Sequence, residues 1–329
     1  MDIDFVITWV NGNDPEWIAD FNRFAPERKR ITDIRNERYR ESGLLKYWFR
    51  GVEKFAPWVR KIHFVTCGQK PDWLNIKAQK LHCVKHNEYI PSKYLPVFSS
   101  HPIELMMHKI PDLAEHFVYF NDDFYITSVV QKEFFFKHGL PCDAAILNVI
   151  PPQKEQINMI KFNNLVCINN KIEQRAIIKK NLSKWFNIRY GLNLVRNILL
   201  LPYSYFPGFL DPHTAVPYTK TSIQDAWKIY SEELYKTMES RFRSTTDVNQ
   251  WLFRYLRLCN GMFSPQNPQK WNRFFTLNDD PQAIKEALIS HKYKEIIIND
   301  SNTPDYNEKL NIIKEGFDFI LPEKSSFEL

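Results

Sequence analysis

The sequence predicts an α/β protein in which helices flank a mostly parallel β-sheet. Apolar, β-branched segments of strand length recur along the first part of the chain, and amphipathic segments of helix length separate them. Polar turn residues follow several of the expected strands. Strands that alternate with helices in this way form the βαβ units of parallel sheets.

The first strand is expected within residues 3–10, where the apolar run IDFVITWV meets the turn sequence NGNDP. An amphipathic helix is expected within residues 41–58, with Ser42 as an early cap and an end near Pro57. Its apolar stripe consists of Leu44, Leu45, Trp48, Phe49, Val52 and Phe55. The next expected elements are strands within residues 59–71 and 80–90, a helix within 100–116 and a strand within 117–123.

The second half of the chain is less regular. Residues 153–205 are rich in Lys, Asn and Ile, and we interpret them as a helical insertion. Residues 1–152 and 206–329 are then expected to form one catalytic α/β domain. The further expected elements are helices within residues 221–243 and 248–263 and a late strand within 292–302.

Composition is typical of a globular chain with a substantial core, since 44% of the 329 residues are apolar and 15% are aromatic. The formal charge of +6 is read as a mild excess spread along the chain, which slightly favours an anionic ligand or surface. Because no clustered basic face is visible, nucleic acid is not an expected partner. The N-terminus does not resemble a signal peptide and no window has the length of a membrane span, so a cytoplasmic location is expected.

The five cysteines are odd in number, scattered and without a CxxC pair. This pattern argues against a zinc site or a disulfide framework, and it predicts buried, reduced thiols with no nucleophile among them. The residues are Cys67, Cys83, Cys142, Cys167 and Cys259.

Asn121, Asp122 and Asp123 directly follow the apolar run HFVYF. Two adjacent acids are costly to bury unpaired, so they indicate a turn, a structural ion-pair node or a site for metal and phosphate. In open α/β sheets, ligands bind outside the carboxyl ends of the strands. The sequences WVNGND, VTCGQ and YFNDD are all expected at such ends.

Several long motifs resemble, in order, the four conserved blocks of the Stealth family. They are DFVITWVNGNDPEW; RYRESGLLKYWFRGVEKFAPWVRKIHFVTCGQKPDWL with VFSSHPIELMMHKIPDLAEHFVYFNDDF; PHTAVPY with FRSTTDVNQ; and IIINDSN with LPEKSSFEL. The resemblance covers nearly the whole chain apart from roughly residues 150–205. The family comprises bacterial capsular and cell-wall polysaccharide phosphotransferases and is similar to the catalytic part of the animal N-acetylglucosamine-1-phosphotransferase.

The resemblance implies a Rossmann-like fold of the nucleotide-sugar transferase type and a definite reaction. Sugar-1-phosphate is expected to pass from a UDP-N-acetylhexosamine donor to a hydroxyl of a glycan acceptor, with release of UMP. The expected cofactor is Mg²⁺ or Mn²⁺, which would neutralise the diphosphate. The expected role is capsule or cell-surface polysaccharide synthesis, with a lipid-linked acceptor at the inner face of the membrane.

Four residues are expected to be catalytic. Asp123 is assigned as the acceptor base and Asp122 as a positioning or metal-linked partner, although the two roles could be exchanged. His213, in the third block, would donate to a phosphate oxygen or assist proton transfer. Arg243 matches an arginine that the resemblance places near the transferred phosphate, with Arg241 as the alternative.

Further residues are expected to bind substrate or metal. For binding they are Asn11, Gly12, Asp14, Arg40, Lys46, Gln69, Glu104, Asn121 and Asn299; for metal they are Asp123 and Asp300. Ordinary structural roles are the alternatives to binding. Asn11 and Gly12 could form a plain turn, Arg40 and Lys46 could be surface charges, and Gln69 could cap a loop. Glu104 could be an ion-pair partner rather than a sugar ligand. The sequence LNDDP beginning at Leu277 is the rival of the pair Asn299 and Asp300.

Two other functional classes fit part of the pattern. A metal-dependent glycosyltransferase also uses acids at strand ends, but it breaks the bond between sugar and phosphate and releases UDP. A non-enzymatic carbohydrate-binding protein could use the 9 Trp and 15 Tyr as stacking surfaces.

The insertion also suggests a peripheral membrane contact. Its basic residues Lys180, Lys184, Arg189 and Arg196 alternate with Trp185, Phe186, Leu194, Ile198 and Leu199. This mixture is typical of helices that lie on anionic membranes. The competing reading is a helix whose apolar stripe packs on the core.

Overall fold

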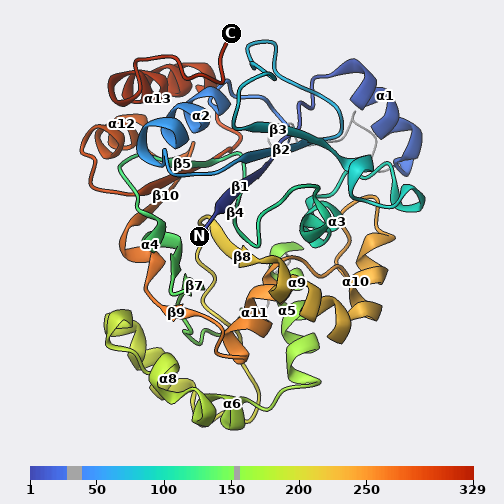
Figure 1. Cartoon of the computed structure of the whole chain (residues 1–329), viewed down its shortest axis with the longest axis vertical. Coiled ribbons are helices and arrows are strands. Elements are labelled where there is room, and N and C mark those ends of the chain that lie inside the picture. Colours follow the sequence, from blue (N-terminus) through green and yellow to red (C-terminus); the bar gives the residue numbers. More distant parts are fainter. Residues whose placement is uncertain (28–38, 152–155) are drawn as a thin grey trace.

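A computed structural model describes residues 1–27, 39–151 and 156–329. Its central feature is a five-stranded sheet (Figure 1). The strand order is β3 (Leu81–Lys85), β2 (Ile62–Thr66), β1 (Ile3–Thr8), β4 (His116–Phe120) and β8 (Val216–Thr219). The first four strands are parallel, and β8 is antiparallel to β4. The chain is therefore an α/β protein with a mixed, largely parallel sheet, as the sequence predicts.

The two faces of this sheet carry two separate apolar cores. Side chains alternate along β1, so Phe5 and Ile7 face the first core and Val6 faces the second. Helix α2 (Leu45–Phe55) packs in the first core, and all six residues of its predicted stripe are buried. It ends before Pro57, as expected.

A second, smaller sheet explains the position of the adjacent acids. It contains β10 (Asn272–Thr276), β11 (Glu295–Asn299) and β5 (Phe124–Ile126), with β10 parallel and β5 antiparallel to β11. Asp122 and Asp123 thus lie where the chain crosses from β4 of the first sheet to β5 of the second. The predicted late strand is β11, but it pairs in this second sheet, which brings the end of β11 opposite the acids.

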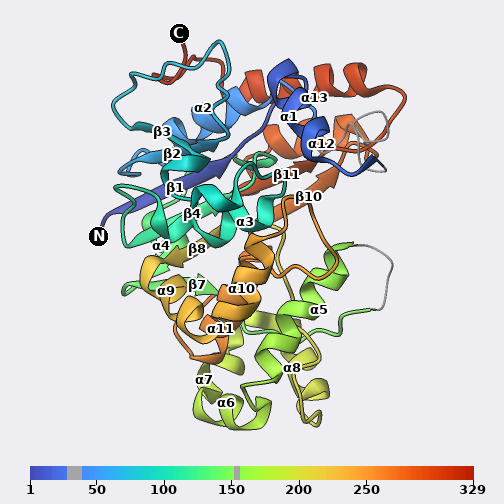
Figure 2. The ribbon, with the colours of Figure 1, turned by 90° about the vertical axis from the view of Figure 1, so that its right-hand side faces the viewer.

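Helices α12 (Pro281–Ile289) and α13 (Tyr306–Ile320) pack against each other beside the second sheet (Figures 1 and 2). Gly51 of α2 lies so close to β5 that a Cβ there would stand 2.5 Å from the carbonyl oxygen of Ile126. The remaining small strands are β6 (Phe136–Lys137), β7 (Leu140–Asp143) and β9 (Ser264–Pro265).

Helices fill the part of the molecule below the central sheet in Figure 2. Those of the expected insertion are α5 (Gln156–Asn169), α6 (Gln174–Lys180), α7 (Leu182–Trp185) and α8 (Leu194–Leu200), and residues 153–155 of that segment lie outside the described residues. The others are α9 (Lys220–Ile229), α10 (Ser231–Met238) and α11 (Trp251–Cys259). Helices α1 (Pro15–Phe24), α3 (Ser100–Leu105) and α4 (Lys132–Phe135) are the remaining α-helices among the described residues.

Two predicted helices are wrong in length. The helix expected within residues 100–116 ends at Leu105 and continues only as the 3₁₀ turn Met107–Lys109. Pro111 disfavours helical geometry in the residue before it, and Asp112 has a positive φ of 56°. The helix expected within residues 221–243 is interrupted at Tyr230, where φ is −120° and ψ is 30°. Tyr230 is fully buried, so its packing overrides the helical pattern.

The cysteine prediction holds in part. All five thiols are unpaired, and Cys142, Cys167 and Cys259 are buried as expected. Cys67 and Cys83 are exposed, because Cys83 lies on the edge strand β3 and Cys67 in the loop after β2. Within the described residues, no helix combines the length and apolar character needed to cross a membrane.

Candidate active site

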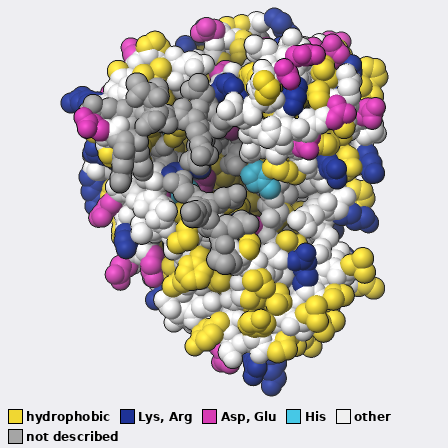
Figure 3. Space-filling model, turned by 180° about the vertical axis from the view of Figure 1, so that it is seen from behind, with side chains coloured by type: hydrophobic (Ala, Val, Ile, Leu, Met, Phe, Trp, Pro, Cys, Tyr) yellow, Lys and Arg dark blue, Asp and Glu magenta, His cyan; other side chains and the backbone are white. Residues whose placement is uncertain are grey.

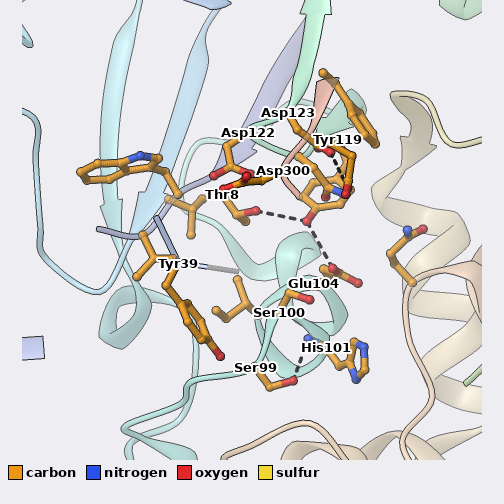
Figure 4. Close-up of a pocket in the computed structure, with 18 of the residues that line it drawn as sticks. Thr8, Tyr39, Ser99, Ser100, His101, Glu104, Tyr119, Asp122, Asp123 and Asp300 are labelled. Carbon is orange, nitrogen blue, oxygen red and sulfur yellow. Dashed lines mark hydrogen bonds between the residues drawn. The ribbon is translucent and has the colours of Figure 1, made fainter. Parts of the chain in front are cut away.

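A cavity of about 510 Å³ opens at the carboxyl ends of β1 and β4. Strand order reverses between these two strands, and at such a point an open α/β sheet forms a crevice suited to ligands. Its walls come from both sheets, from α3 and from the segment around His213. Figure 4 shows Asp122, Asp123 and Asp300 toward one end of this cavity and the residues of α3 toward the other.

Nine of the predicted site residues line this cavity, namely Arg40, Glu104, Asn121, Asp122, Asp123, His213, Arg243, Asn299 and Asp300. They come from positions up to 260 residues apart, as the contact between Arg40 and Asp300 illustrates. The other five do not line it: Asn11, Gly12, Asp14, Lys46 and Gln69, all of which are described.

Asp123 stands at the junction of three elements. Its Oδ2 accepts a hydrogen bond of 3.2 Å from Nδ2 of Asn299, and it lies 3.7 Å from Nε2 of His213. That second distance is too long for a hydrogen bond. The imidazole of His213 is held edge-on by Phe124 and Phe274, and its Nε2 is buried without a hydrogen-bond partner within the described chain. A proton donor or acceptor in the cavity would complete this arrangement.

Asp122 is reached by solvent but has protein around most of its surface, because it lies in a concave site. Burial raises the pKa of its carboxyl to about 7, and the neighbouring charges of Asp123 and Glu41 act in the same direction. The cavity therefore concentrates negative charge at this end, a surplus that a cation would relieve.

Asp300 is held by Arg40. The guanidinium donates to both carboxylate oxygens, at 3.0 Å from Nε and 2.6 Å from Nη2. It also lies 3.4 Å from the centre of the Tyr306 ring, which fixes its plane. The predicted metal ligand Asp300 and the predicted phosphate ligand Arg40 thus bind each other in this structure.

The donor set accommodates a hard cation only with help from substrate. Among the described residues, no group of three or more His, Cys, Asp or Glu side chains is close enough to hold a metal ion. Mg²⁺, however, is commonly held by one or two carboxylates with water and substrate phosphates. Asp123 and Asn299 lie side by side, with the amide nitrogen of Asn299 donating to Oδ2 of Asp123. Their oxygens could contribute to such a site, and a diphosphate would supply the rest. The metal remains a prediction.

A chain of hydrogen bonds leads from Thr8, near the aspartates, through the hydroxyl of Tyr119 to Glu104 of α3 (Figure 4). Glu104 is buried, and burial raises the pKa of its carboxyl, while His101 and Arg243 oppose that shift. Its Oε2 has no hydrogen-bond partner among the described residues. Both predicted readings of Glu104 therefore stay open, since it lies near Arg243 and also offers a free acceptor to the cavity.

Arg243 and Arg241 are the two candidates for the arginine near the transferred phosphate, and they lie in different places. Arg243 lines the cavity and donates from Nη2 to Oγ of Ser100 at 3.2 Å. Arg241 does not line it; its guanidinium lies over the ring of Phe24, 4.6 Å from the centre. Arg243 is the arginine placed to meet a ligand.

The sequence analysis missed a buried histidine and aspartate. Nδ1 of His101 lies 2.9 Å from Oδ2 of Asp247, and that oxygen also accepts from the backbone of Ser244. His101 lines the cavity. Both residues lie inside the quoted blocks, but 146 positions separate them, so no local spacing could pair them.

The five residues outside the cavity have structural contacts elsewhere. Asn11 and Gln69 exchange two hydrogen bonds of 2.9 Å, which tie the loop after β1 to the loop after β2. A Cβ on Gly12 would stand 2.7 Å from the carbonyl oxygen of Tyr39, so glycine allows that segment to approach. Asp14 caps α1 by accepting from Trp17 N, and Lys46 lies on α2 beside the ring of Tyr47.

Carboxylates, arginines and histidines around one cavity at the carboxyl edge of a sheet are typical of α/β enzymes whose ligands carry charge. Comparison with known proteins agrees. Models of the Stealth protein conserved regions 1, 2 and 3 match residues 1–26, 38–142 and 212–253. The chain belongs to the Stealth family of polysaccharide phosphotransferases. The expected fourth block stays a prediction.

Curated relatives match along nearly the full chain. A capsular polysaccharide phosphotransferase, WcwK, of Streptococcus pneumoniae is 40% identical over 328 residues, which cover 99% of this chain and 98% of the relative. The receptor polysaccharide phosphotransferase WefC of Streptococcus oralis is 37% identical over 99% of both chains. The exopolysaccharide phosphotransferase cps2G of Lactiplantibacillus plantarum is 34% identical over 99% of this chain and 96% of its own.

Proposed function

We propose that this protein transfers sugar-1-phosphate from a UDP-sugar, a UDP-N-acetylhexosamine, to a hydroxyl of a glycan acceptor during synthesis of a capsular or other surface polysaccharide. The observation that carries the proposal is that Asp122, Asp123, His213 and Arg243 all line one cavity, where Asp123 lies near His213. The relatives support it, because they are named as phosphotransferases of capsular, receptor and extracellular polysaccharides.

In the proposed step, the acceptor oxygen attacks the phosphorus that carries the sugar. One P–O bond forms to the acceptor, and the P–O bond to the UMP phosphate breaks. The hydroxyl proton passes to a carboxylate, and UMP leaves. Negative charge develops on the phosphoryl oxygens, so catalysis depends mainly on positioning and on charge stabilisation.

The residues divide between these tasks. Asp123 accepts the proton of the acceptor, oriented by the amide of Asn299. His213 lies on the same side of the cavity and donates to an oxygen of the reacting group. Arg243 supplies a planar pair of donors to the transferred phosphate. The exchange of roles between Asp122 and Asp123 remains the alternative.

The buried pair His101 and Asp247 holds the backbone next to Arg243 in place. The carboxylate holds one ring nitrogen of His101, and the same oxygen accepts from Ser244, the residue after Arg243. The turn that carries the arginine is thereby fixed to α3. A fixed donor needs no reorganisation when charge develops, which is the condition for effective electrostatic stabilisation.

Asp123, Asn299 and Asp300 would hold Mg²⁺ or Mn²⁺ in this proposal. When bound, the ion would neutralise the diphosphate of the donor. Arg40 would remain bound to Asp300 and keep that carboxylate oriented.

The decisive experiment identifies the released nucleotide. Purified protein is incubated with a panel of UDP-hexoses and UDP-N-acetylhexosamines, Mg²⁺ and glycan acceptors, and the products are analysed by mass spectrometry and ³¹P NMR. Attack at phosphorus requires UMP and a phosphodiester in the product. Release of UDP with a phosphate-free glycoside would contradict the proposal and indicate a metal-dependent glycosyltransferase.

A further inference from the structure

The segment from α7 through α8 to Tyr205 exposes large apolar side chains. Leu192 is 91% exposed, Ile188 87% and Leu199 68%. The apolar face, as we name it, consists of Leu182, Ile188, Leu192, Val195, Ile198, Leu199, Leu201, Tyr203 and Tyr205. In Figure 3, hydrophobic side chains gather over the lower part of the molecule, below a hollow. Many exposed apolar side chains gathered in one region mark an interaction site.

Helix α8 buries the polar residue Asn197, while Leu194 and Leu200 pack partly against the cores. Asn197 is buried; its side chain accepts from Leu147 N at 2.7 Å and donates to the carbonyls of Ala145 and Trp185. Ile198 and Leu199, the next two residues, are exposed. Because this arrangement leaves apolar side chains in water, it indicates that the outer side of α8 meets an apolar medium.

Two of the residues predicted to contact the membrane have structural roles instead. Trp185 is fully buried and packs in the second core, so it cannot reach a surface. Lys184 donates to the carbonyls of Gly261 and Phe263 and is a structural residue. Ile198 and Leu199, by contrast, are exposed as a membrane contact requires.

Helix α5 exposes further apolar side chains. Ile157 lines the cavity and is itself exposed. Met159, Phe162 and Val166 are exposed as well and share the opposite face of the helix. The exposed apolar surface of the insertion therefore includes one residue at the cavity wall.

The charge of the chain is concentrated in the same segment. Of the 44 Lys and Arg and 38 Asp and Glu, nine and two lie within residues 153–205, so the rest of the chain is close to neutral. The expectation of a charge spread along the chain is wrong. Lys179 and Lys180 are exposed and lie three and two residues before Leu182 of the apolar face. Their positions join the positive charge to the apolar side chains.

We propose that the apolar face docks on an anionic lipid bilayer. Exposed aliphatic side chains would enter the boundary between headgroups and acyl chains, and Tyr203 and Tyr205 suit the same boundary. The lysines would bind the headgroups. A symmetric contact between two copies is disfavoured because it would place two strongly positive segments against each other. The proposal is independent of the reaction, since docking needs neither donor nor acceptor.

Liposome co-sedimentation tests this proposal with the full chain. Wild-type protein is expected to bind liposomes of phosphatidylcholine with phosphatidylglycerol, to bind pure phosphatidylcholine less, and to be released by salt. Each basic residue near an anionic surface changes the partition coefficient about fivefold, so Lys179→Glu with Lys180→Glu should lower it by roughly 25-fold or more. Leu192→Ser with Ile198→Ser and Leu199→Ser should lower it at least about tenfold.

Matched controls lie on other parts of the surface. Lys70→Glu with Lys77→Glu reverses two exposed charges, and Ile76→Ser with Phe319→Ser removes two exposed apolar side chains. Both controls should sediment with liposomes like wild type. Failure of wild type to bind anionic liposomes at low salt would overturn the proposal, as would equal binding by the three-serine variant. Sedimentation velocity without lipid detects the other outcome: a wild-type dimer that the serines dissociate, with no liposome binding, assigns the face to a second copy.

Discussion

Asp123 is the carboxylate that the structure connects to both Asn299 and His213. Asp123→Asn keeps the size of the side chain and removes its capacity to accept a proton. We expect turnover, measured as UMP release, to fall by roughly 10²-fold or more, which is the usual contribution of acid–base help. Circular dichroism and thermal melting would show whether the fold persists. Near-normal turnover in a folded variant would instead assign the proton to His213.

Arg243 and Arg241 form a natural pair for comparison, because only Arg243 lines the cavity. Arg243→Lys keeps the charge but loses the planar, two-pronged donor. We expect kcat to fall by roughly 10-fold to 10²-fold, with a smaller change in KM for the nucleotide sugar, since the contact strengthens as charge develops. Arg241→Lys is the control and should retain activity. The reverse result would show that the other arginine meets the phosphate.

At the scale of elements, a buried ion network joins α11 to β7 and to the segment that carries His213. Arg254 binds Asp143 at 2.8 Å and Asp211 at 3.0 Å, and Arg257 binds Asp143 at 2.5 Å. All four side chains are almost completely buried. Because Asp211 lies two residues before His213, the network fixes a wall of the cavity as well as a helix.

Removing one acid from this network should be costly. Asp143→Ala leaves two buried guanidinium groups without their shared partner, so we expect the free energy of unfolding to fall by about 3–5 kcal/mol. Chemical denaturation measures the change. Asp225→Ala is the matched control, because its ion pair with Lys228 is exposed on α9 and should contribute less than about 1 kcal/mol. A similar loss of unfolding free energy in both variants would show that the buried network stabilises the fold no more than an exposed ion pair does.

At the scale of the whole molecule, Glu295 joins the two sheets. It lies at the start of β11, and its Oε1 accepts from the backbone N of Ala215, next to β8, at 2.8 Å. Its other oxygen has no partner in the described chain, and burial raises the pKa of the carboxyl to about 8. At neutral pH the folded protein therefore holds this group in its neutral form.

The raised pKa makes stability depend on pH in a definite direction. Between the unfolded value of 4.5 and the folded value of about 8, the folded chain retains a proton that the unfolded chain has lost. Each unit of that difference corresponds to about 1.4 kcal/mol, so this contribution is lost as pH rises through the window. Glu295→Gln keeps the acceptor and has no proton to lose. We expect the Tm difference, variant minus wild type, to rise from pH 5 to pH 8.

Differential scanning fluorimetry across this pH range provides the measurement for Glu295→Gln. The comparison is made at constant ionic strength, so that screening of surface charges does not change with pH. A Tm difference that stays constant across the range would contradict the assignment of a raised pKa to Glu295.

Several features of this protein are determined by short stretches of its sequence. The apolar stripe of α2 and the strands β1, β2 and β4 follow from periodicities of 3.6 and 2 residues. About a dozen consecutive residues are enough to show such a periodicity. Turn residues after these strands placed Asp122 and Asp123 correctly at a sheet edge. The ordered motifs also identified the family, and nine of the predicted site residues line the cavity.

Other features were decided only by the tertiary structure. Local sequence cannot show that Arg40 binds Asp300, that His101 binds Asp247, or that β11 belongs to a second sheet, because each depends on contacts across more than a hundred residues. Burial also overrode local pattern at Tyr230, which ends a helix, and at Asn197, which is buried while its apolar neighbours Ile198 and Leu199 are exposed. Periodicity reports that a helix has two faces, but the surrounding chain decides which face meets the core.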